Sequence, residues 1–165
     1  MTVPAFLSPS SCEPETLVSP LARALAGVDS EVVSDLSLQG KVELRGDLDR
    51  FATIEGEELV QLSPRRGLLL TGDPGAAIER ARAEGVLGYE ATGLLAGFTV
   101  QGEQLMRRLT DLDLDRLPAA GPYARVAAIV LRDEGERFRV YVAQELGHDV
   151  VHATLDALAG LEERA

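Results

Sequence analysis

The feature that most limits the possible folds is a loose internal repeat, which should be sought before motifs. Each copy begins with an acidic and a hydroxyl residue, continues with an alternating strand, and ends with glycine and an acid. In the first copy these segments are Asp35–Ser37, Gly40–Arg45 and Gly46-Asp47. In the second they are Glu90–Thr92, Gly97–Gln101 and Gly102-Glu103. In the first strand, apolar Val42 and Leu44 alternate with polar neighbours. This period of two is typical of a strand with one buried face.

Both copies also finish alike, with a strand that leads into a helix. In the first copy, we predict a strand over Leu68–Thr71 and a helix over Ala76–Glu84. In the second, a strand over Phe138–Val142 precedes a helix that ends at Gly160. Apolar residues three and four apart give that last helix one hydrophobic stripe. The repeat therefore covers most of the chain beyond its first 34 residues.

The second copy is longer and completes the pattern. It adds a helix over Glu103–Leu109 and a buried strand over Val126–Leu131, followed by a hairpin loop. Strand, helix, strand, strand, helix is the order of a ferredoxin-like half. We therefore predict one α+β domain over residues 35–165. It would contain two ferredoxin-like half-repeats, at about 35–88 and 89–165, the first of them abbreviated.

Residues 1–34 are predicted to form an extended N-terminal arm with one short helix. Prolines that remove backbone donors are interleaved with serines over the first 20 residues. The helix is expected over Leu21–Ala26, because Ser19 suits the cap, Pro20 the first helical position and Gly27 the end.

Charge and composition exclude several classes of partner. With 27 Asp plus Glu against 16 Lys plus Arg, the 165-residue chain has a net charge of −11 and lacks the basic stripe that nucleic acid requires. Its apolar stretches are far shorter than the roughly 20 residues of a membrane span. No basic residue precedes Arg23, so the positive start of a signal peptide is missing. Cys12, the single cysteine, allows no internal disulfide. We expect a cytoplasmic protein.

The most tempting local motif is His148-Asp149-Val150-Val151-His152. Two histidines four residues apart on a helix can bind zinc, and an acid between them can act as a base. However, Asp149 replaces the usual glutamate, and the chain has no other histidine. We therefore expect both histidines on the solvent side of an amphipathic helix, without a metal ion.

Asp111, Asp113 and Asp115 resemble the start of a calcium-binding loop. Such a loop requires glycine at its sixth position and glutamate at its twelfth, and here Arg116 and Pro122 stand there. The interpretation that remains is a connector whose carboxylates face water, while Leu112 and Leu114 point inward.

Gly67–Gly75 has the pattern of a strand, a glycine turn and a helix start, which can bind an anion. A phosphate-binding P-loop needs lysine and a hydroxyl residue after its last glycine, but Asp73 and Pro74 follow Gly72. Asp73 would repel a phosphate and is well placed to cap the helix.

No other motif indicates catalysis. Cys12 lies in the proline-rich arm, without neighbours that would stabilise a thiolate. Arg45-Gly46-Asp47 is explained as a turn after a strand, and no G-x-S-x-G elbow is present. The sequence therefore predicts no catalytic residue and no metal ligand, and it leaves cofactor-binding residues unknown.

A family resemblance is carried mainly by the second half of the chain. The residues that carry it are Glu90–Thr92, Ala96–Gly102, Leu105–Leu114, Leu117-Pro118, Arg125–Arg132 and Phe138–Val142 with the closing helix, and Ser19–Leu21 near the start. This pattern resembles the glycine-cleavage T-protein-like (aminomethyltransferase-like, folate-binding) superfamily of one-carbon metabolism. It is most similar to the short members of that superfamily, the gamma subunits of heterotetrameric sarcosine oxidase.

The resemblance implies a non-catalytic subunit of an oxidoreductase complex. In that family the larger subunits carry flavin, NAD and folate, and the gamma subunit is a small companion without cofactors. The chain lacks the paired-acid segment of full-length aminomethyltransferases and the K-G-C-Y-x-G-Q-E signature of related folate proteins. No folate-binding or catalytic residue is therefore carried over. The alternative is a stand-alone folate-binding or aminomethyltransferase-like protein, which rests on fold analogy alone.

Overall fold

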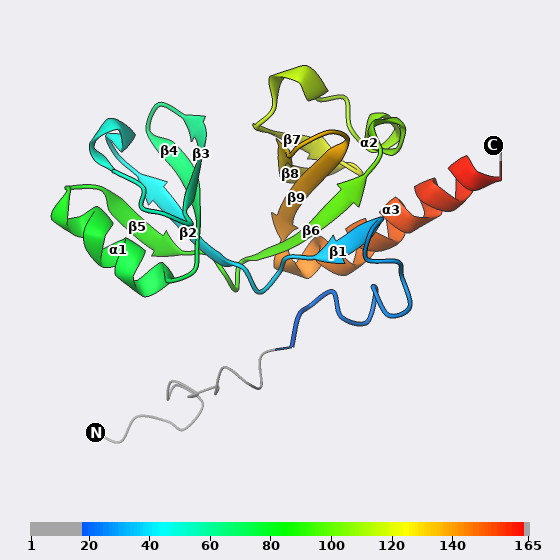
Figure 1. The fold of residues 1–165 in the computed structure, drawn as a ribbon, viewed down its shortest axis with the longest axis horizontal. Helices are drawn as coiled ribbons and strands as arrows, with labels where there is room; N and C mark the ends of the chain where they lie inside the picture. Colours follow the sequence, from blue (N-terminus) through cyan, green and yellow to red (C-terminus); the bar gives the residue numbers. More distant parts are fainter. Residues whose placement is uncertain (1–17, 164–165) are drawn as a thin grey trace.

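A computed structural model describes residues 18–163 of the chain, and the predicted extended arm lies largely outside this range. The described part forms two antiparallel sheets and three α-helices (Figure 1). The strands are β1 (Val33–Asp35), β2 (Gly40–Arg45), β3 (Glu58–Ser63), β4 (Arg66–Thr71), β5 (Leu87–Glu90), β6 (Leu95–Gln101), β7 (Ala119–Tyr123), β8 (Val126–Arg132) and β9 (Arg137–Ala143). The helices are α1 (Pro74–Ala83), α2 (Glu103–Leu109) and α3 (Gly147–Glu162).

The strand order shows which segments of the chain belong to each sheet. The first sheet has the order β3-β4-β2-β5, and the second has the order β1-β6-β9-β8-β7. Strand β1 precedes the first sheet in sequence but pairs with β6 of the second, with Val33 opposite Val100. The chain therefore passes between the sheets twice, through the linkers 36–39 and 91–94.

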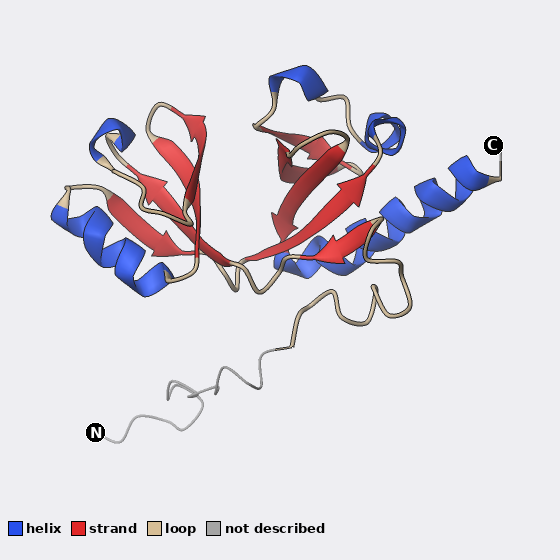
Figure 2. Cartoon of the chain, viewed as in Figure 1, coloured by secondary structure: helices blue, strands red, loops and turns tan. Residues whose placement is uncertain are grey.

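Each sheet has a helical outer layer, and the sheets meet on their inner faces. Figure 2 shows α1 outside the first sheet and α3 outside the second. Three apolar clusters follow from this layering. One lies between the first sheet and α1 and contains Val42, Leu44, Leu69, Ala77 and Ala81. The largest lies between the second sheet and helices α2 and α3, and includes Phe98, Val100, Met106, Val140 and Val151.

The third cluster joins the sheets to each other. Val60, Leu68 and Leu70 from the first sheet pack with Leu131 and Tyr141 from the second. Because these side chains alternate along their strands with those of the outer clusters, both faces of the central strands are buried. This explains the largely apolar sequences of β4, β6 and β9, whose interiors carry little polar surface.

The structure confirms an α+β fold and several predicted elements. Helix α2 has the predicted bounds, and β2 has the predicted strand over Gly40–Arg45. Strands β8 and β9 extend the predicted segments by one or two residues. The division into ferredoxin-like half-repeats stays a prediction at this point. Strands β1, β3, β5 and β7 were not predicted.

Two predicted features were wrong. Residues 21–26 form turns, not a helix, and the single helical bond in this stretch runs from Leu25 N–H to the Leu21 carbonyl. A segment this short cannot repay helix nucleation by itself. Buried Leu21 and Ala24 fix it against the core of the second sheet instead. Gly160 does not end α3, which continues to Glu162, because this glycine keeps a negative φ.

Two glycines of α3 give a matched test of the packing. A Cβ on buried Gly147 would lie 2.6 Å from the Ala96 Cβ, whereas one on Gly160 would meet only the far end of Arg108 at 3.8 Å. Gly147→Ala should therefore lower the free energy of unfolding by about 1–3 kcal/mol through overpacking. Gly160→Ala should raise it by about 0.4–1 kcal/mol, because the unfolded chain loses freedom. Urea denaturation of both variants checks this, and equal effects would contradict the described packing.

Candidate functional site

The most unusual group in the structure is Lys41, the only lysine of the chain, at the junction of the two sheets. Its side chain lies on the inner face of β2 and is fully buried. The Nζ atom donates hydrogen bonds to the backbone oxygens of Ser37 at 2.8 Å and of Gln39 at 2.6 Å. Both acceptors belong to the linker between β1 and β2. The ammonium group therefore holds this linker against β2, the strand that follows it.

Tyr141 of β9 connects the same linker to the second sheet. Its hydroxyl donates to the Gln39 Oε1 at 2.7 Å, and its ring centroid lies 6.0 Å from the Lys41 Nζ. The ring lies against Gly97 of β6, where a Cβ would be only 2.7 Å away. The junction thus requires glycine at position 97. Leu36 N–H donates to the Gly97 oxygen at 2.7 Å and completes the connection.

The second linker is tied to Lys41 through the backbone. The Lys41 N–H donates to the Thr92 Oγ1 at 3.0 Å, and the Ala91 N–H donates to the Lys41 oxygen at 2.8 Å. Both crossings between the sheets therefore converge on one residue. This arrangement holds the sheets in a fixed relation and leaves Lys41 without access to solvent.

Burial also changes the acid–base properties of these two side chains. Desolvation lowers the pKa of Lys41 from 10.5 to about 8, and the nearby Asp35 carboxylate opposes this change. Burial raises the pKa of Tyr141 to about 12. Because Lys41 is enclosed and hydrogen-bonded to two carbonyls, its chemistry is structural, and it is not a nucleophile that a substrate could reach.

A second polar connection between the sheets involves Arg139 of β9. Its guanidinium binds the Glu58 carboxylate of β3 with both nitrogens, at 2.7 and 2.9 Å, and also Asp133 at 2.7 Å. The arginine side chain is only 13% exposed. Ion pairing raises its pKa further above the usual range against the effect of burial. A bidentate pair of this kind has more geometric specificity than a surface ion pair.

An exposed apolar surface lies beside the junction. We define the junction patch as Val18, Leu38 and Leu94, which are 78%, 55% and 65% exposed. Val18 and Leu38 line a cavity of about 250 Å³ together with residues of the 91–94 linker. Large exposed apolar side chains that gather at one place mark interaction surfaces. The junction patch is therefore the candidate contact surface of this chain.

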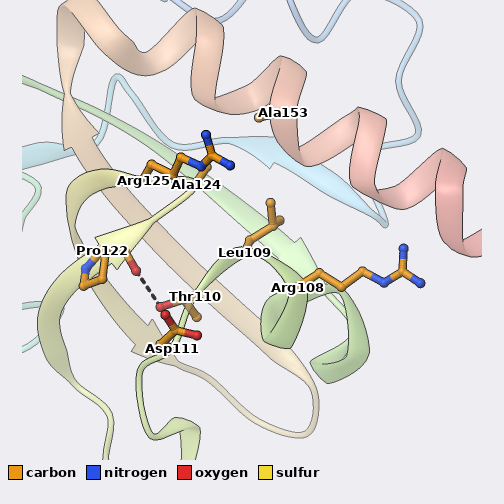
Figure 3. A pocket seen from close by; sticks show the side chains of 8 residues that line it. All are labelled: Arg108, Leu109, Thr110, Asp111, Pro122, Ala124, Arg125 and Ala153. Atoms are coloured by element: carbon orange, nitrogen blue, oxygen red, sulfur yellow. Dashed lines mark hydrogen bonds between the residues drawn. The ribbon is translucent and has the colours of Figure 1, made fainter.

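A separate cavity of about 510 Å³ lies between α2, the β7–β8 turn and α3 (Figure 3). Arg108 and Leu109 reach it from the end of α2, Arg125 from the turn between β7 and β8, and Ala153 from α3. It does not include any residue of the junction.

The two histidines lie where the sequence placed them. His148 and His152 are exposed on α3, with 3.2 Å between their Nε2 atoms. Residues 18–163 contain no group of three or more His, Cys, Asp or Glu side chains placed to hold a metal ion. The exposure of both side chains agrees with the predicted position on the solvent side of the helix.

The acidic motifs have the structural roles predicted for them. Asp73 Oδ1 accepts a hydrogen bond from the Ala76 N–H at 3.0 Å and caps α1. Asp111, Asp113 and Asp115 are exposed, while Leu114 is buried. Cys12 lies outside the described residues.

Sequence reasoning missed the junction. Lys41 alternates with Val42, which indicated a solvent-facing side chain on a half-buried strand. That the chain contains one lysine was the only available signal. Among the helices of the described region, none has the length and apolar character needed to cross a membrane.

The architecture is similar to that of a known protein structure. No family model and no curated protein matches the chain. A solved structure with a similar fold is the heterotetrameric sarcosine oxidase from Corynebacterium sp. U-96 in complex with pyrrole 2-carboxylate. One of its chains superposes with a TM-score of 0.76 and 12% identity, over 87% of this chain and 95% of that chain. The resemblance seen in the sequence is thus confirmed at the level of the fold.

The pKa of Lys41 predicts an unusual pH dependence of stability. Above about pH 8 the folded chain has released a proton that the unfolded chain still binds, so the free energy of unfolding should rise with pH. The rise should reach a few kcal/mol at most by about pH 9.5. Above about pH 10 the tyrosines of the unfolded chain lose their protons, and because burial raises the pKa of Tyr141 in the folded chain, stability should fall again. Lys41→Met, which removes the titrating group, should abolish the rise. Urea denaturation at several pH values checks this, and equal slopes for both proteins would contradict it.

Proposed function

We propose that the chain is a non-catalytic, gamma-type subunit of a heteromeric sarcosine oxidase-like complex, an amine-oxidising flavoprotein. The end-to-end agreement of fold with one chain of a heterotetrameric sarcosine oxidase carries this proposal. The shared region makes up a larger part of that chain than of this one, so that chain is similar in length and slightly shorter. The counterpart is therefore a small subunit and not one domain of a large chain.

The polar groups at the junction support a scaffolding role. Lys41, Tyr141 and Arg139 all direct their donors to acceptors within this chain. Such groups stabilise one arrangement of the sheets and leave no donor directed at a substrate. We infer that flavin, NAD and tetrahydrofolate lie on larger partner subunits, and that the assembly is cytoplasmic.

The sheet topology supports the division into half-repeats. In the first sheet, β2, β3, β4 and β5 stand in the order 3-4-2-5, with α1 between β4 and β5. In the second sheet, β6, β8 and β9 take the places of β2, β3 and β4, and β1 takes the place of β5. We infer two ferredoxin-like halves, of which the second obtains its last strand from the N-terminal segment. The first half is abbreviated because three residues, Leu48–Arg50, replace its first helix.

We further infer that the junction patch contacts the larger subunit. A chain with a net charge of −11 meets an electrostatic cost wherever a partner presents like charge. The three side chains of the junction patch are uncharged and gain from burial, whereas exposed Glu90, which lines the cavity beside them, requires a partner group that is not acidic. Leu38 and Leu94 belong to the two linkers, and the linker that carries Leu94 is held by hydrogen bonds from the Leu94 N–H to the Ala91 oxygen and from the Lys41 N–H to the Thr92 Oγ1.

Co-purification tests the proposed function directly. The full chain, tagged and expressed in its source cells, should purify with larger chains whose spectrum shows bound flavin and which consume oxygen when sarcosine is added. The chain purified alone should show no flavin absorbance. If it stays monomeric and binds no flavoprotein, the proposal is wrong. A melting temperature that tetrahydrofolate raises in the isolated chain would instead favour the stand-alone folate-binding alternative.

Substitutions in the junction patch test the contact surface. Leu38→Glu combined with Leu94→Glu should weaken assembly with the flavoprotein at least about tenfold, because two charges would be buried unpaired. Ile54→Glu is the matched control, since Ile54 is equally exposed, at 56%, but lies outside the patch. All variants should unfold within about 0.5 kcal/mol of the wild type. Quantified co-purification gives the answer, and undiminished assembly of the double variant would exclude this surface.

A further inference from the structure

We propose that the cavity between α2, the β7–β8 turn and α3 binds an organic carboxylate between Arg108 and Arg125. The cavity has a volume of about 510 Å³. In Figure 3 the two arginines flank the Leu109 side chain, one from the end of α2 and the other from the β7–β8 turn. The site is separate from the junction and from the junction patch. A free organic acid as its ligand is independent of the proposed function, whereas a carboxylate from a partner subunit rests on it.

Within the described residues, Arg108 and Arg125 form no ion pair. Nine arginines in residues 18–163 form ion pairs with carboxylates. Within the same range, neither Arg108 nor Arg125 has a carboxylate within 4.0 Å, and Arg108 makes only a 3.5 Å contact with the Gly160 oxygen. In a chain with a net charge of −11, two guanidinium groups that line one cavity and form no ion pair within the described residues favour an anionic ligand.

The turn that carries Arg125 is strained. Ala124 and Arg125 have φ values of 47° and 69°, in the left-handed region. Tyr123 pairs with Val126, so these two residues alone form the hairpin turn, a position where Asn-Gly is preferred. Strained backbone of this kind gathers at binding sites, where the surrounding structure holds it in place.

Two short hydrogen bonds hold this turn against α2. The Ala124 N–H donates to the Leu109 oxygen at 2.7 Å, and the buried Thr110 Oγ1 donates to the Pro122 oxygen at 2.6 Å. These bonds fix the backbone of Arg125 relative to the end of α2, which carries Arg108. The backbones of the two arginines are therefore held in a common frame, and both side chains are exposed at the cavity.

The remaining walls define the chemistry of the ligand. Leu109, Pro122, Ala124 and Ala153 give the cavity apolar surface, which suits a carbon skeleton better than inorganic phosphate. Asp111 also lines the cavity and opposes binding of an anion. The ligand that fits is a carboxylate on an aliphatic stem. It can come from a free organic acid or from an acidic side chain of a partner subunit.

Calorimetric titration of the full chain with glutarate tests whether the ligand is a free organic acid. Glutaramide, which has a similar carbon skeleton without the charge, is the control ligand. Glutarate should bind and glutaramide should not. Arg125→Gln and Arg108→Gln should each weaken binding about tenfold or more, because each removes a charge-assisted hydrogen bond. Asp111→Asn should strengthen it. Arg65→Gln is the control, since Arg65 is exposed and lies on a different cavity. The melting temperature of each variant is measured to check that it is folded.

The same variants test the partner source. If glutarate does not bind, Arg108→Gln and Arg125→Gln should still weaken assembly with the flavoprotein about tenfold, while Arg65→Gln does not. That result assigns the carboxylate to the partner. Glutarate binding that Arg125→Gln leaves unchanged would overturn the inference. The inference is also overturned if the wild-type chain binds no glutarate and if, in an assembly that forms normally with the wild-type chain, neither arginine variant weakens assembly.

Discussion

The arrangement of the whole chain depends on one buried charge, the ammonium group of Lys41. A charge taken out of water is costly unless it finds partners, and here the partners are two carbonyls of the β1–β2 linker. Those bonds shape the linker so that Gln39 reaches Tyr141 of the second sheet. The backbone of the same residue holds the other linker through Ala91 and Thr92. Both crossings between the sheets are thus fixed at one point.

The fixed junction explains why the N-terminal part of the described chain belongs to the second sheet. Strand β1 pairs with β6 at the edge of that sheet, and Leu21 and Ala24 pack against its core. The helices occupy the outer faces, and the inner faces bury each other through the cluster around Tyr141. Val18, Leu38 and Leu94 remain exposed beside the junction, together with the charged side chain of Glu90.

How far the sequence predicts this structure depends on local signals. Helix α2, strand β2 and the Asp73 cap have strong periodicity or capping chemistry and were predicted. Strand β7 contains Gly121 and Pro122, which oppose a strand prediction, and it forms because β8 offers a partner. The burial of Lys41 and the left-handed turn at Arg125 have no local signal. Both depend on packing between different elements. Lys41 lies beside Tyr141 of the second sheet. The turn at Arg125 is hydrogen-bonded to Leu109 and Thr110 at the end of α2.

The central claim is that this chain is a companion subunit whose cofactors lie elsewhere. Cryo-electron microscopy of the flavoprotein complex purified through this chain tests it most directly. The account predicts one copy of the two-sheet fold against a larger chain, with the junction patch buried at the contact and flavin bound only by the larger chain. Flavin bound within the two-sheet fold, or a purified oxidase that lacks this chain, would contradict it.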